Sequence, residues 1–557
     1  MRTQLLLLIL LLFTATMFPQ DRSQARSMVI TRYGIAATSY IQASQAGAQI
    51  LAQGGSAADA AIAANAVLGV AEPMMNGMGG DLFVLYWDAK TGKLYGLNAS
   101  GWAPKGLTRE HILAKDKDAT RMPHHGIDSI TVPGAVDGWD KLHQRFGKLP
   151  WKELFRSAIF YAREGYPVPE LIHGYWEGAL ENLQSDPESR RVYLPGGKPP
   201  VVGQIFKNPD LAQSLELVAN QGPSAFYRGP IADSILKTSQ ELGGTMAADD
   251  LSEFSSDWVE PISTTYRDWT VYELPPNGQG MAALEMLNIM ETFPPASDGP
   301  LSATELHTRI EAMKLAYADL ERYNGDPRFA KIPVKGLLSK EYAQQRSKLI
   351  DPNKANCHVT AGTPPASETT YLSVVDRNGN IASLIQSNYD EFGSGITVRG
   401  RGFVLQDRGA LFSLDPNSPN VLAPRKRPFH TIIPAFMQRG DVHMGFGIMG
   451  GANQPLAHAQ FVSNVVDYGM DIQQALETAR FTVSAQRGCR ILIESRVKPD
   501  VLKELTAKGH DLDVRGDFSS NMGRGQAVIH DSKTGVNYGA SDARADGSAE
   551  PEPPPIK

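Results

Sequence analysis

The sequence predicts an α+β fold, in which α-helices accompany β-hairpins, and two helical patterns and two hairpin patterns support this. Residues 57–68 form an alanine-rich apolar run. Ser56 precedes the run as a helix-capping residue, and Asp59 follows three positions later, as in a capping box. Residues 304–323 carry apolar side chains at helical spacing and end at Gly325-Asp326-Pro327. The first pattern predicts a buried helix and the second a longer one.

Two pairs of apolar runs predict the hairpins. Residues 82–86 and 94–97 flank a segment rich in turn-forming residues. Residues 370–376 and 381–388 flank an Asn-Gly turn, which is a strong hairpin signal. A polar, proline-containing loop precedes the second hairpin, so the chain enters that hairpin from a long connection.

Composition and charge narrow the function. The chain has 557 residues and a net charge of -6, which comes from 54 Lys and Arg against 60 Asp and Glu. A nucleic-acid-binding protein is expected to show a basic excess. We therefore expect no nucleic-acid partner, and the length fits either several domains or one large unit.

The N-terminus predicts export. Arg2 gives a positive start, residues 5–13 are an unbroken apolar run, and charged residues follow. We interpret residues 1–26 as a signal peptide with an uncertain cleavage site, although an uncleaved anchor is an alternative. No later segment is apolar enough to span a bilayer, so the mature protein is expected to be periplasmic or secreted, without a stable membrane span.

The two cysteines, Cys357 and Cys489, are too few for a zinc-binding tetrad or a disulfide-rich scaffold. They could form one bridge or remain two separate packed thiols, and we favour the separate thiols. His124-His125 could suggest a metal ligand pair, but we interpret it as a loop feature.

The second hairpin places a threonine where it could do chemistry. Counting back from the turn sets Thr370 opposite Ser387 and Thr369 opposite Asn388, and a slip of one residue would exchange Ser387 with a neighbour. A threonine hydroxyl is a weak nucleophile. Cleavage of the chain just before Thr369 would release an α-amino group, with a pKa of about 7.7 to 8.0, as a base on the same residue. Glu368-Thr369-Thr370 alone is a commonplace triplet, so the surroundings must decide.

Those surroundings resemble the γ-glutamyltransferase (glutathione hydrolase) family of N-terminal nucleophile hydrolases. The matching segments run in the family's order from about residue 30 to residue 546. The upstream matches are residues 54–60, Gly79-Gly80-Asp81, 132–134, 311–319 and 338–342. The downstream matches are residues 369–376, Phe392-Gly393-Ser394-Gly395, 423–428 and Gly450-Gly451.

The resemblance implies a precursor that cuts itself between Glu368 and Thr369. The products would be a large subunit of residues 27–368 and a small subunit of residues 369–557, the latter ending in a tail, residues 546–557, that we expect to be disordered. Together they would form one αββα sandwich. Thr369 would form an acyl-enzyme and pass the acyl group to water or an amine, with no cofactor and no metal ion.

Gly450 and Gly451 match the family's oxyanion-binding pair, which suits backbone N–H groups that must approach a substrate closely. Residues 445–450 also fit the G-x-G-x-x-G pattern of dinucleotide-binding domains, with Asp467 near the expected spacing. That alternative needs further strand-helix-strand units, which the remaining chain does not show.

Several polar residues near these motifs are candidates for assisting catalysis or binding substrate. Ser387 is expected to assist the nucleophile, and the expected substrate contacts are Arg408, His430, Thr431, Asn388, Tyr389 and Ser100. Arg408 could bind a carboxylate through two hydrogen bonds, or it could form a structural ion pair with Asp407 or another acid.

The substrate expectation is limited by departures from the family pattern. Ser100 stands where glutathione-cleaving members have an arginine for the α-carboxylate, and Leu411 stands where they have an aspartate for the α-amino group. These traits resemble the branch of cephalosporin-acylase-like and oxamate-amidohydrolase-like proteins. We expect cleavage of γ-glutamyl amides such as glutathione, with hydrolysis favoured over transpeptidation. The alternatives are a glutaryl or oxamate type of amidohydrolase and a catalytically silent binding protein on the same fold.

Overall fold

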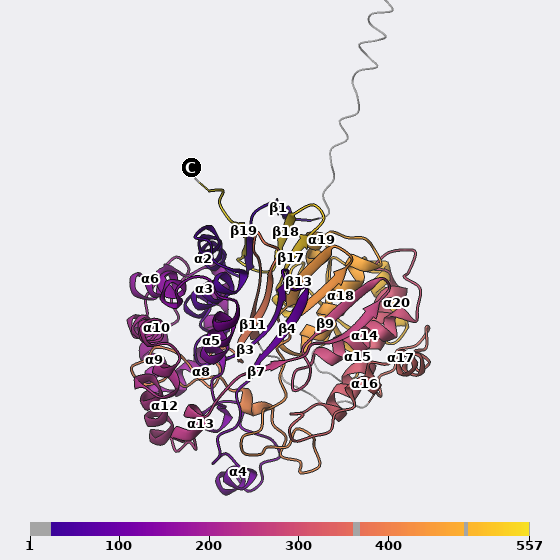
Figure 1. Ribbon diagram of the computed structural model, residues 1–557. Coiled ribbons are helices and arrows are strands. Elements are labelled where there is room, and N and C mark those ends of the chain that lie inside the picture. Colours follow the sequence, from indigo (N-terminus) through magenta and orange to yellow (C-terminus); the bar gives the residue numbers. More distant parts are fainter. Residues whose placement is uncertain (1–23, 360–367, 484–487, 556–557) are drawn as a thin grey trace, which may run out of the picture.

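The computed structural model describes residues 24–359, 368–483 and 488–555. Two seven-stranded antiparallel sheets lie face to face, and helices cover the outer face of each, which gives four layers (Figure 1). Sheet I has the order β19-β2-β10-β11-β3-β4-β7, and sheet II has the order β1-β18-β17-β13-β12-β9-β8. The predicted αββα sandwich is therefore confirmed.

Sheet I combines strands from both ends of the chain. Its strands are β2 (Ile35–Thr38), β3 (Asp81–Asp88), β4 (Lys93–Ala99), β7 (Asp257–Val259), β10 (Glu368–Val375), β11 (Ile381–Tyr389) and β19 (Ser548–Pro551). Sheet II is formed by β1 (Val29–Thr31), β8 (Ile262–Tyr266), β9 (Trp269–Glu273), β12 (Ala435–Arg439), β13 (Val442–Ile448), β17 (Gly525–Asp531) and β18 (Val536–Ser541). Smaller sheets are formed by β14 (Phe481–Val483), β15 (Arg490–Glu494) and β16 (Asp511–Arg515), and by β5 (Tyr166–Pro167) and β6 (Ile205–Phe206).

The helices divide between the two outer faces (Figure 1). Those on the side of sheet I are α2 (Ile41–Ala52), α3 (Ala57–Ala71), α5 (Ala135–Phe146), α6 (Arg156–Glu164), α7 (Glu170–Gly178), α8 (Leu180–Ser185), α9 (Pro187–Tyr193), α10 (Pro209–Gln221), α11 (Ser224–Tyr227), α12 (Pro230–Glu241) and α13 (Ala248–Ser252). Those on the side of sheet II are α14 (Gly280–Glu291), α15 (Ala303–Tyr323), α16 (Val334–Leu337), α17 (Lys340–Ser347), α18 (Gln454–Val466), α19 (Ile472–Glu477) and α20 (Pro499–Ala507). The short α4 (Arg109–Lys115) packs against a separate apolar cluster. No helix of the described chain is both long and apolar enough to cross a membrane.

Three apolar cores follow from this layering. One lies between the first helical layer and sheet I, and a second lies between sheet II and the other helices. The third fills the space between the sheets and includes Phe83, Tyr371 and Met449. Both sheets are thus buried on both faces, and for this reason their strands are near-continuous apolar runs. Because the sheets share a core, a large part of the chain must fold as one unit.

The predicted helices and hairpins are confirmed. The alanine-rich run is α3, and Ser56 and Asp59 form its capping box. The second helical pattern is α15, and the predicted hairpins are β3-β4 and β10-β11. The dinucleotide-binding alternative is excluded, because β13 pairs antiparallel with both β12 and β17.

The register of the β10-β11 hairpin differs by one residue from the prediction. Val375 pairs with Ile381, and Thr370 pairs with Gln386 instead of Ser387. The cause is Asp376, whose carboxylate accepts hydrogen bonds from Asn380 N, at 3.1 Å, and from Ala57 N at the start of α3, also at 3.1 Å. Asp376 therefore belongs to the turn and not to the ladder.

Two glycines of β13 allow the sheets to come close together. A Cβ on Gly447 would lie 2.5 Å from Cε2 of Tyr371, and a Cβ on Gly445 would lie 2.9 Å from Oγ of Ser373. β13 and β10 thus run in opposite directions where they face each other, with Gly447 opposite Tyr371 and Gly445 opposite Ser373.

The tail that we expected to be disordered contains strand β19. Ser548–Pro551 pairs with the free edge of β2, and the Glu552 carboxylate accepts a hydrogen bond from Gly34 N at 2.9 Å. Pro551 fits there because it closes a short edge strand. The prediction failed because the polar, proline-rich composition of this segment says nothing about the edge that is available to it.

The preference for two separate thiols is also wrong, because Cys357 and Cys489 form a disulfide with a Cα–Cα distance of 4.9 Å. They are 132 residues apart in sequence. The fold brings them together because Ala355 N donates to Lys508 O at 2.7 Å and Asp511 N donates to Cys489 O at 2.8 Å. These two backbone contacts hold the loop before β10 against the turn that leads into β15.

Candidate active site

Thr369 lies at the start of β10, in the middle of sheet I. The pairing with β11 is irregular between Glu368 and Thr370, so Thr369 occupies a β-bulge. Its Oγ1 lies 3.4 Å from Oγ of Ser387, and both side chains are fully buried. Bulges re-aim side chains next to active sites. The structure therefore brings together the predicted nucleophile and its predicted assistant.

Tyr389 holds Ser387 in place. Its backbone has a φ of 84°, a left-handed conformation that is unusual for a side chain of this size. In this conformation its N–H donates to Ser387 Oγ at 2.8 Å. Asn388, between them, uses its Nδ2 to donate to Pro73 O at 3.2 Å. Strained backbone beside the nucleophile is typical of a functional site.

Thr370, the residue after the predicted nucleophile, is anchored by Glu72, Asn76 and Ser39. Thr370 Oγ1 donates to Glu72 Oε2 at 2.7 Å and accepts from Asn76 Nδ2 at 3.2 Å. Ser39 Oγ also donates to Glu72, at 2.8 Å. Burial raises the pKa of Glu72. These bonds fix the backbone of β10 immediately beyond Thr369.

Arg408 is the cation nearest to this region among the predicted residues. It begins the short 3-10 helix η4 (Arg408–Leu411) and is fully buried. Its Nη1 donates to Thr431 Oγ1 at 2.7 Å, its Nε lies 3.8 Å from Asp81 Oδ2, and its guanidinium lies 4.6 Å from the ring centre of Tyr389. Among the described residues, its Nη2 has no hydrogen-bond partner. The ion-pair partner is thus Asp81 instead of Asp407, and one face of the guanidinium has unused donors.

Asp81, the last residue of the Gly79-Gly80-Asp81 motif, also belongs to this group of side chains. Its Oδ1 accepts from Gly101 N at 2.8 Å, and its Oδ2 lies 3.0 Å from His430 Nε2. Burial and the neighbouring Arg408 lower the pKa of His430 to about 4, so His430 is neutral near pH 7. The Gly79-Gly80-Asp81 motif was the available signal, because two glycines before an acid at the start of a strand let other backbones approach.

Ser100 lies next to this group but faces a different set of partners. Its Oγ accepts from Asn277 Nδ2 at 3.1 Å, and its carbonyl accepts from Arg427 Nε at 2.8 Å. Arg427 also pairs with Asp257 at 2.7 Å. Arg427 is therefore committed to structural contacts, whereas Arg408 has donors to offer.

Gly450 and Gly451 follow β13 and open the short 3-10 helix η5 (Gly451–Asn453). Both have positive φ, 126° and 56°, which disfavours any other residue. Met449, the residue before them, lies in the same core between the sheets as Tyr371. Gln279 Nε2 donates to Gly451 O at 2.8 Å and fixes the turn. This location is compatible with backbone N–H donors for an oxyanion.

Within the described part of the chain, two clusters contain at least three side chains of metal-ligating type. One is His124, His125, Asp390 and Asp407, and the other is His307, Glu311 and His510. Thr369 belongs to neither. In the second cluster, Lys314 Nζ lies 2.7 Å from Glu311 Oε1 and already supplies a positive charge.

A threonine at the head of a central strand, in a sandwich of two antiparallel sheets between helical layers, defines the N-terminal nucleophile class of hydrolases. The gamma-glutamyltranspeptidase family model matches residues 43–552. The chain belongs to this family, and is an amidohydrolase of it.

Relatives and solved structures agree with this assignment. The chain is 38% identical to the glutathione hydrolase-like YwrD proenzyme of Bacillus subtilis, over 94% of this chain and 99% of that protein. It is 33% identical to the oxamate amidohydrolase proenzyme of Klebsiella pneumoniae, over 93% and 98%. The crystal structure of cephalosporin acylase from Bacillus halodurans superposes with a TM-score of 0.89 at 40% identity, and covers 96% of this chain and 99% of that one.

Proposed function

We propose that this chain cuts itself between Glu368 and Thr369, and that the mature enzyme hydrolyses amides whose acyl group carries a terminal carboxylate. Water is the favoured acceptor. The observation that carries the substrate proposal is the buried Arg408 guanidinium, which has unused donors and packs against Tyr389, two residues after Ser387. Support for maturation comes from the YwrD-like and oxamate amidohydrolase relatives, which are named as proenzymes.

The burial of Thr369 argues for intramolecular cleavage. Its side chain is fully buried, so another protein could not reach the bond. Its hydroxyl would attack the carbonyl carbon of Glu368 and shift the acyl group from nitrogen to oxygen. Water would then hydrolyse the ester, which releases the Glu368 carboxylate and the Thr369 amine. The reaction is favoured by proximity, because both groups belong to adjacent residues.

In the mature enzyme, the same hydroxyl would attack the substrate. The Thr369 amine would accept the hydroxyl proton and then donate it to the leaving amine. Ser387, 3.4 Å from Thr369 Oγ1, would relay or orient that proton. The N–H groups at Gly450 and Gly451 would stabilise the oxyanion, and water would release the acyl group.

The structure favours recognition of a carboxylate over recognition of an α-amino group. Arg408 can offer Nη2 to a carboxylate. Asp81, the acid beside it, is already engaged by Gly101 N and His430. Leu411, at the end of η4, provides no charge.

A comparison of three acyl donors tests this proposal. We expect glutaryl and γ-glutamyl p-nitroanilides to be hydrolysed with similar kcat/KM, and butyryl p-nitroanilide, which lacks the carboxylate, at least about tenfold less efficiently. A strong preference for γ-glutamyl over glutaryl would favour the second candidate, a γ-glutamyl hydrolase of the glutathione type, which the family match supports. No hydrolysis of any donor by cleaved protein would favour a silent binding protein.

The pH dependence should follow the amine of Thr369. The amine must be neutral to accept a proton, so kcat/KM should rise with pH through an apparent pKa of about 7 to 8, or lower if the amine is desolvated. His430 does not titrate in this range, because its pKa is about 4, and burial raises the pKa of Tyr389 well above its usual value. A rate that falls as pH rises from 6 to about 8 would contradict this base.

The disulfide should keep the two subunits covalently joined after cleavage. Cys357 precedes the proposed cleavage point and Cys489 follows it. We expect mature protein to migrate as one band on a denaturing gel without reductant and as two bands with it. Cys489→Ser should give two bands in both conditions. Two bands from the wild type without reductant would show that the bridge does not form.

We also propose that the protein is exported to an oxidising compartment, the periplasm or the outside. The apolar N-terminal run supports export but falls in residues 1–23, outside the described chain. The disulfide supports it independently, because such bonds persist in oxidising compartments. Arg26 Nη1 donates to Gly547 O at 2.7 Å, so signal removal before this residue would preserve its contacts.

A further inference from the structure

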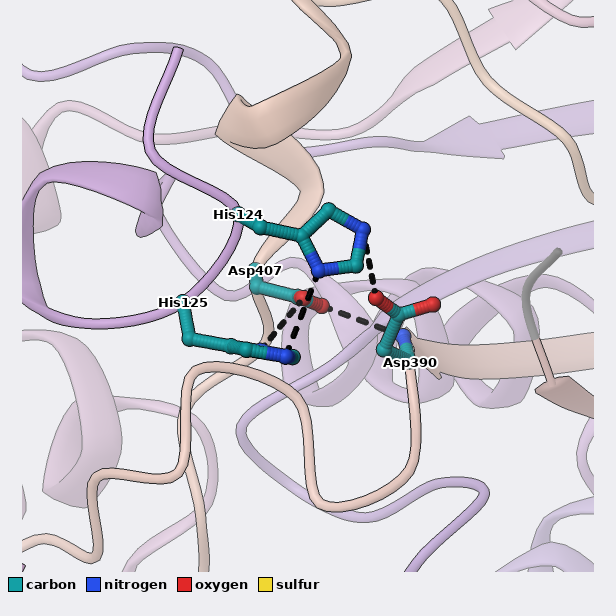
Figure 2. Close-up of side chains that lie close together, drawn as sticks. All are labelled: His124, His125, Asp390 and Asp407. Carbon is teal, nitrogen blue, oxygen red and sulfur yellow. Dashed lines mark hydrogen bonds and ion pairs between the residues drawn. The ribbon is translucent and has the colours of Figure 1, made fainter. Parts of the chain in front are cut away.

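Two histidines and two aspartates, His124, His125, Asp390 and Asp407, form a cluster (Figure 2). His124 and His125 come from the loop before the 3-10 helix η1 (Ile127–Ser129), Asp390 follows β11, and Asp407 precedes η4. One ligand-type atom from each residue lies within 4.8 Å of all the others. The sequence alone predicts only a loop feature for the two histidines, because the aspartates that complete the cluster are far away along the chain.

We propose that these four residues bind one divalent transition-metal ion, with zinc as the best match. A tetrahedral zinc ion with bonds of about 2.0 to 2.2 Å holds neighbouring ligand atoms about 3.3 to 3.6 Å apart. Here His124 Nε2 lies 3.0 Å from Asp390 Oδ2, and His124 Nδ1 lies 3.2 Å from His125 Nε2. His125 Nδ1 lies 3.5 Å from Asp407 Oδ2. Each ring offers only one nitrogen to an ion, and one ligand atom from each of the four residues lies within 4.8 Å of the others. Small side-chain movements would bring this set to the spacing of a metal site.

The chemistry of the donors selects the class of ion. Imidazole suits zinc, copper and nickel, whereas magnesium and calcium prefer oxygen ligands alone. Two carboxylates would balance the charge of a divalent ion. Asp407 is fully buried and Asp390 is 4% exposed, and Oδ2 of each faces a histidine ring nitrogen, at 3.5 Å and 3.0 Å. A bound cation would replace protonated histidines as the positive partner of both carboxylates.

Access and orientation also fit a metal site. The side chains of His124 and His125 are 45% and 42% exposed, so an ion could enter from solvent. His125 Nδ1 lies 3.1 Å from Gly393 O. A metal-binding histidine commonly donates its second ring N–H to a backbone carbonyl, which here would present Nε2 to the ion. The backbone N–H of Asp390 donates to Asp407 Oδ1 at 3.1 Å, which fixes the Asp407 carboxylate against the Asp390 backbone.

The alternative to a metal site is a set of metal-free ion pairs between protonated histidines and the two aspartates. Direct measurements of metal binding distinguish these two interpretations.

The ion would join the loop of the proposed large subunit to two segments of the small one. Asp390 is next to Tyr389, and Asp407 is next to Arg408, so an ion would steady the segments that carry the carboxylate-reading pocket. Catalysis by Thr369 does not require it.

The test is titration of EDTA-treated, dialysed protein with zinc chloride in a calorimeter. We expect one high-affinity zinc per chain, and His124→Gln and His125→Gln should each weaken binding at least about tenfold. His173→Gln is the matched control. This histidine has a nearby acid, Glu177, at 3.6 Å, but lies outside the cluster, so its loss should leave binding unchanged. Cobalt in place of zinc should give the intense visible spectrum of a four-coordinate ion.

Both variants alter partly exposed side chains, so folding can be checked by the melting temperature. Absence of binding to the wild type would overturn the proposal. Binding that survives both histidine substitutions would also overturn it, because the ion would then bind elsewhere, for example at His307 and His510. A cobalt spectrum typical of a six-coordinate, water-ligated ion would overturn it as well. None of these outcomes depends on self-cleavage or on hydrolysis, so failure here would leave the proposed function standing.

Discussion

Thr369→Ala should purify as one uncleaved chain and should hydrolyse acyl amides at least about a thousandfold more slowly than the wild type. The substitution removes the hydroxyl that attacks the Glu368 carbonyl, so the α-amino base is never released. A denaturing gel run with reductant shows the chain composition, and a p-nitroanilide assay gives the rate. Reductant is essential, because Cys357 and Cys489 would hold cleaved subunits together.

Thr369→Ser is the matched control, because it keeps the hydroxyl and removes only a methyl group. It should still cleave, and the cleaved fraction should retain activity. Thr369 is buried in sheet I, so both variants need a comparison of melting temperatures with the wild type. An uncleaved Thr369→Ala protein with undiminished activity would refute the role of Thr369 in both steps.

Arg408→Ala should raise the KM for glutaryl and γ-glutamyl donors at least about tenfold, and self-cleavage should remain intact. The loss of charge-assisted hydrogen bonds to a carboxylate is worth about 1.5 to 3 kcal/mol, and tenfold corresponds to about 1.4 kcal/mol. Steady-state kinetics on both donors measures the effect. Intact self-cleavage would show that the variant folds.

The control for this prediction is an uncharged donor. The KM for butyryl p-nitroanilide should change little in Arg408→Ala, since that acyl group has no carboxylate to contact. Arg408→Lys should recover part of the affinity, because it restores the charge without the planar pair of donors. An equal rise in KM for charged and uncharged donors would mean that Arg408 only supports the pocket through Thr431 and Asp81.

The elements that the sequence predicted correctly are those with local signals. The capping box at Ser56 starts α3, and the Asn-Gly turn joins β10 and β11. The position of Thr369 near Ser387 also followed, because the turn limits the register to within one residue. The exact register did not follow, since Asp376 is drawn into the turn by contacts that include α3, a helix far away in sequence.

Contacts between segments that are far apart in the sequence could not be predicted. The disulfide joins cysteines 132 residues apart, and β19 exists because β2 leaves an edge unpaired. Asp81 is another example. It meets Arg408 and His430 only because the fold brings η4 and the later segment that carries His430 against β3. The Gly79-Gly80-Asp81 motif marks the position, but the sequence does not indicate these partners.

The central claim is that Thr369 becomes the N-terminal residue of the small subunit and carries the acyl group. The most direct measurement is the intact mass of the reduced enzyme, before and during turnover of a glutaryl amide. We predict a small subunit whose mass corresponds to residues 369–557, and a second species heavier by one glutaryl group, with fragmentation placing the addition on Thr369. A small subunit that begins at another residue, or an acyl group carried by a different side chain, would contradict the account.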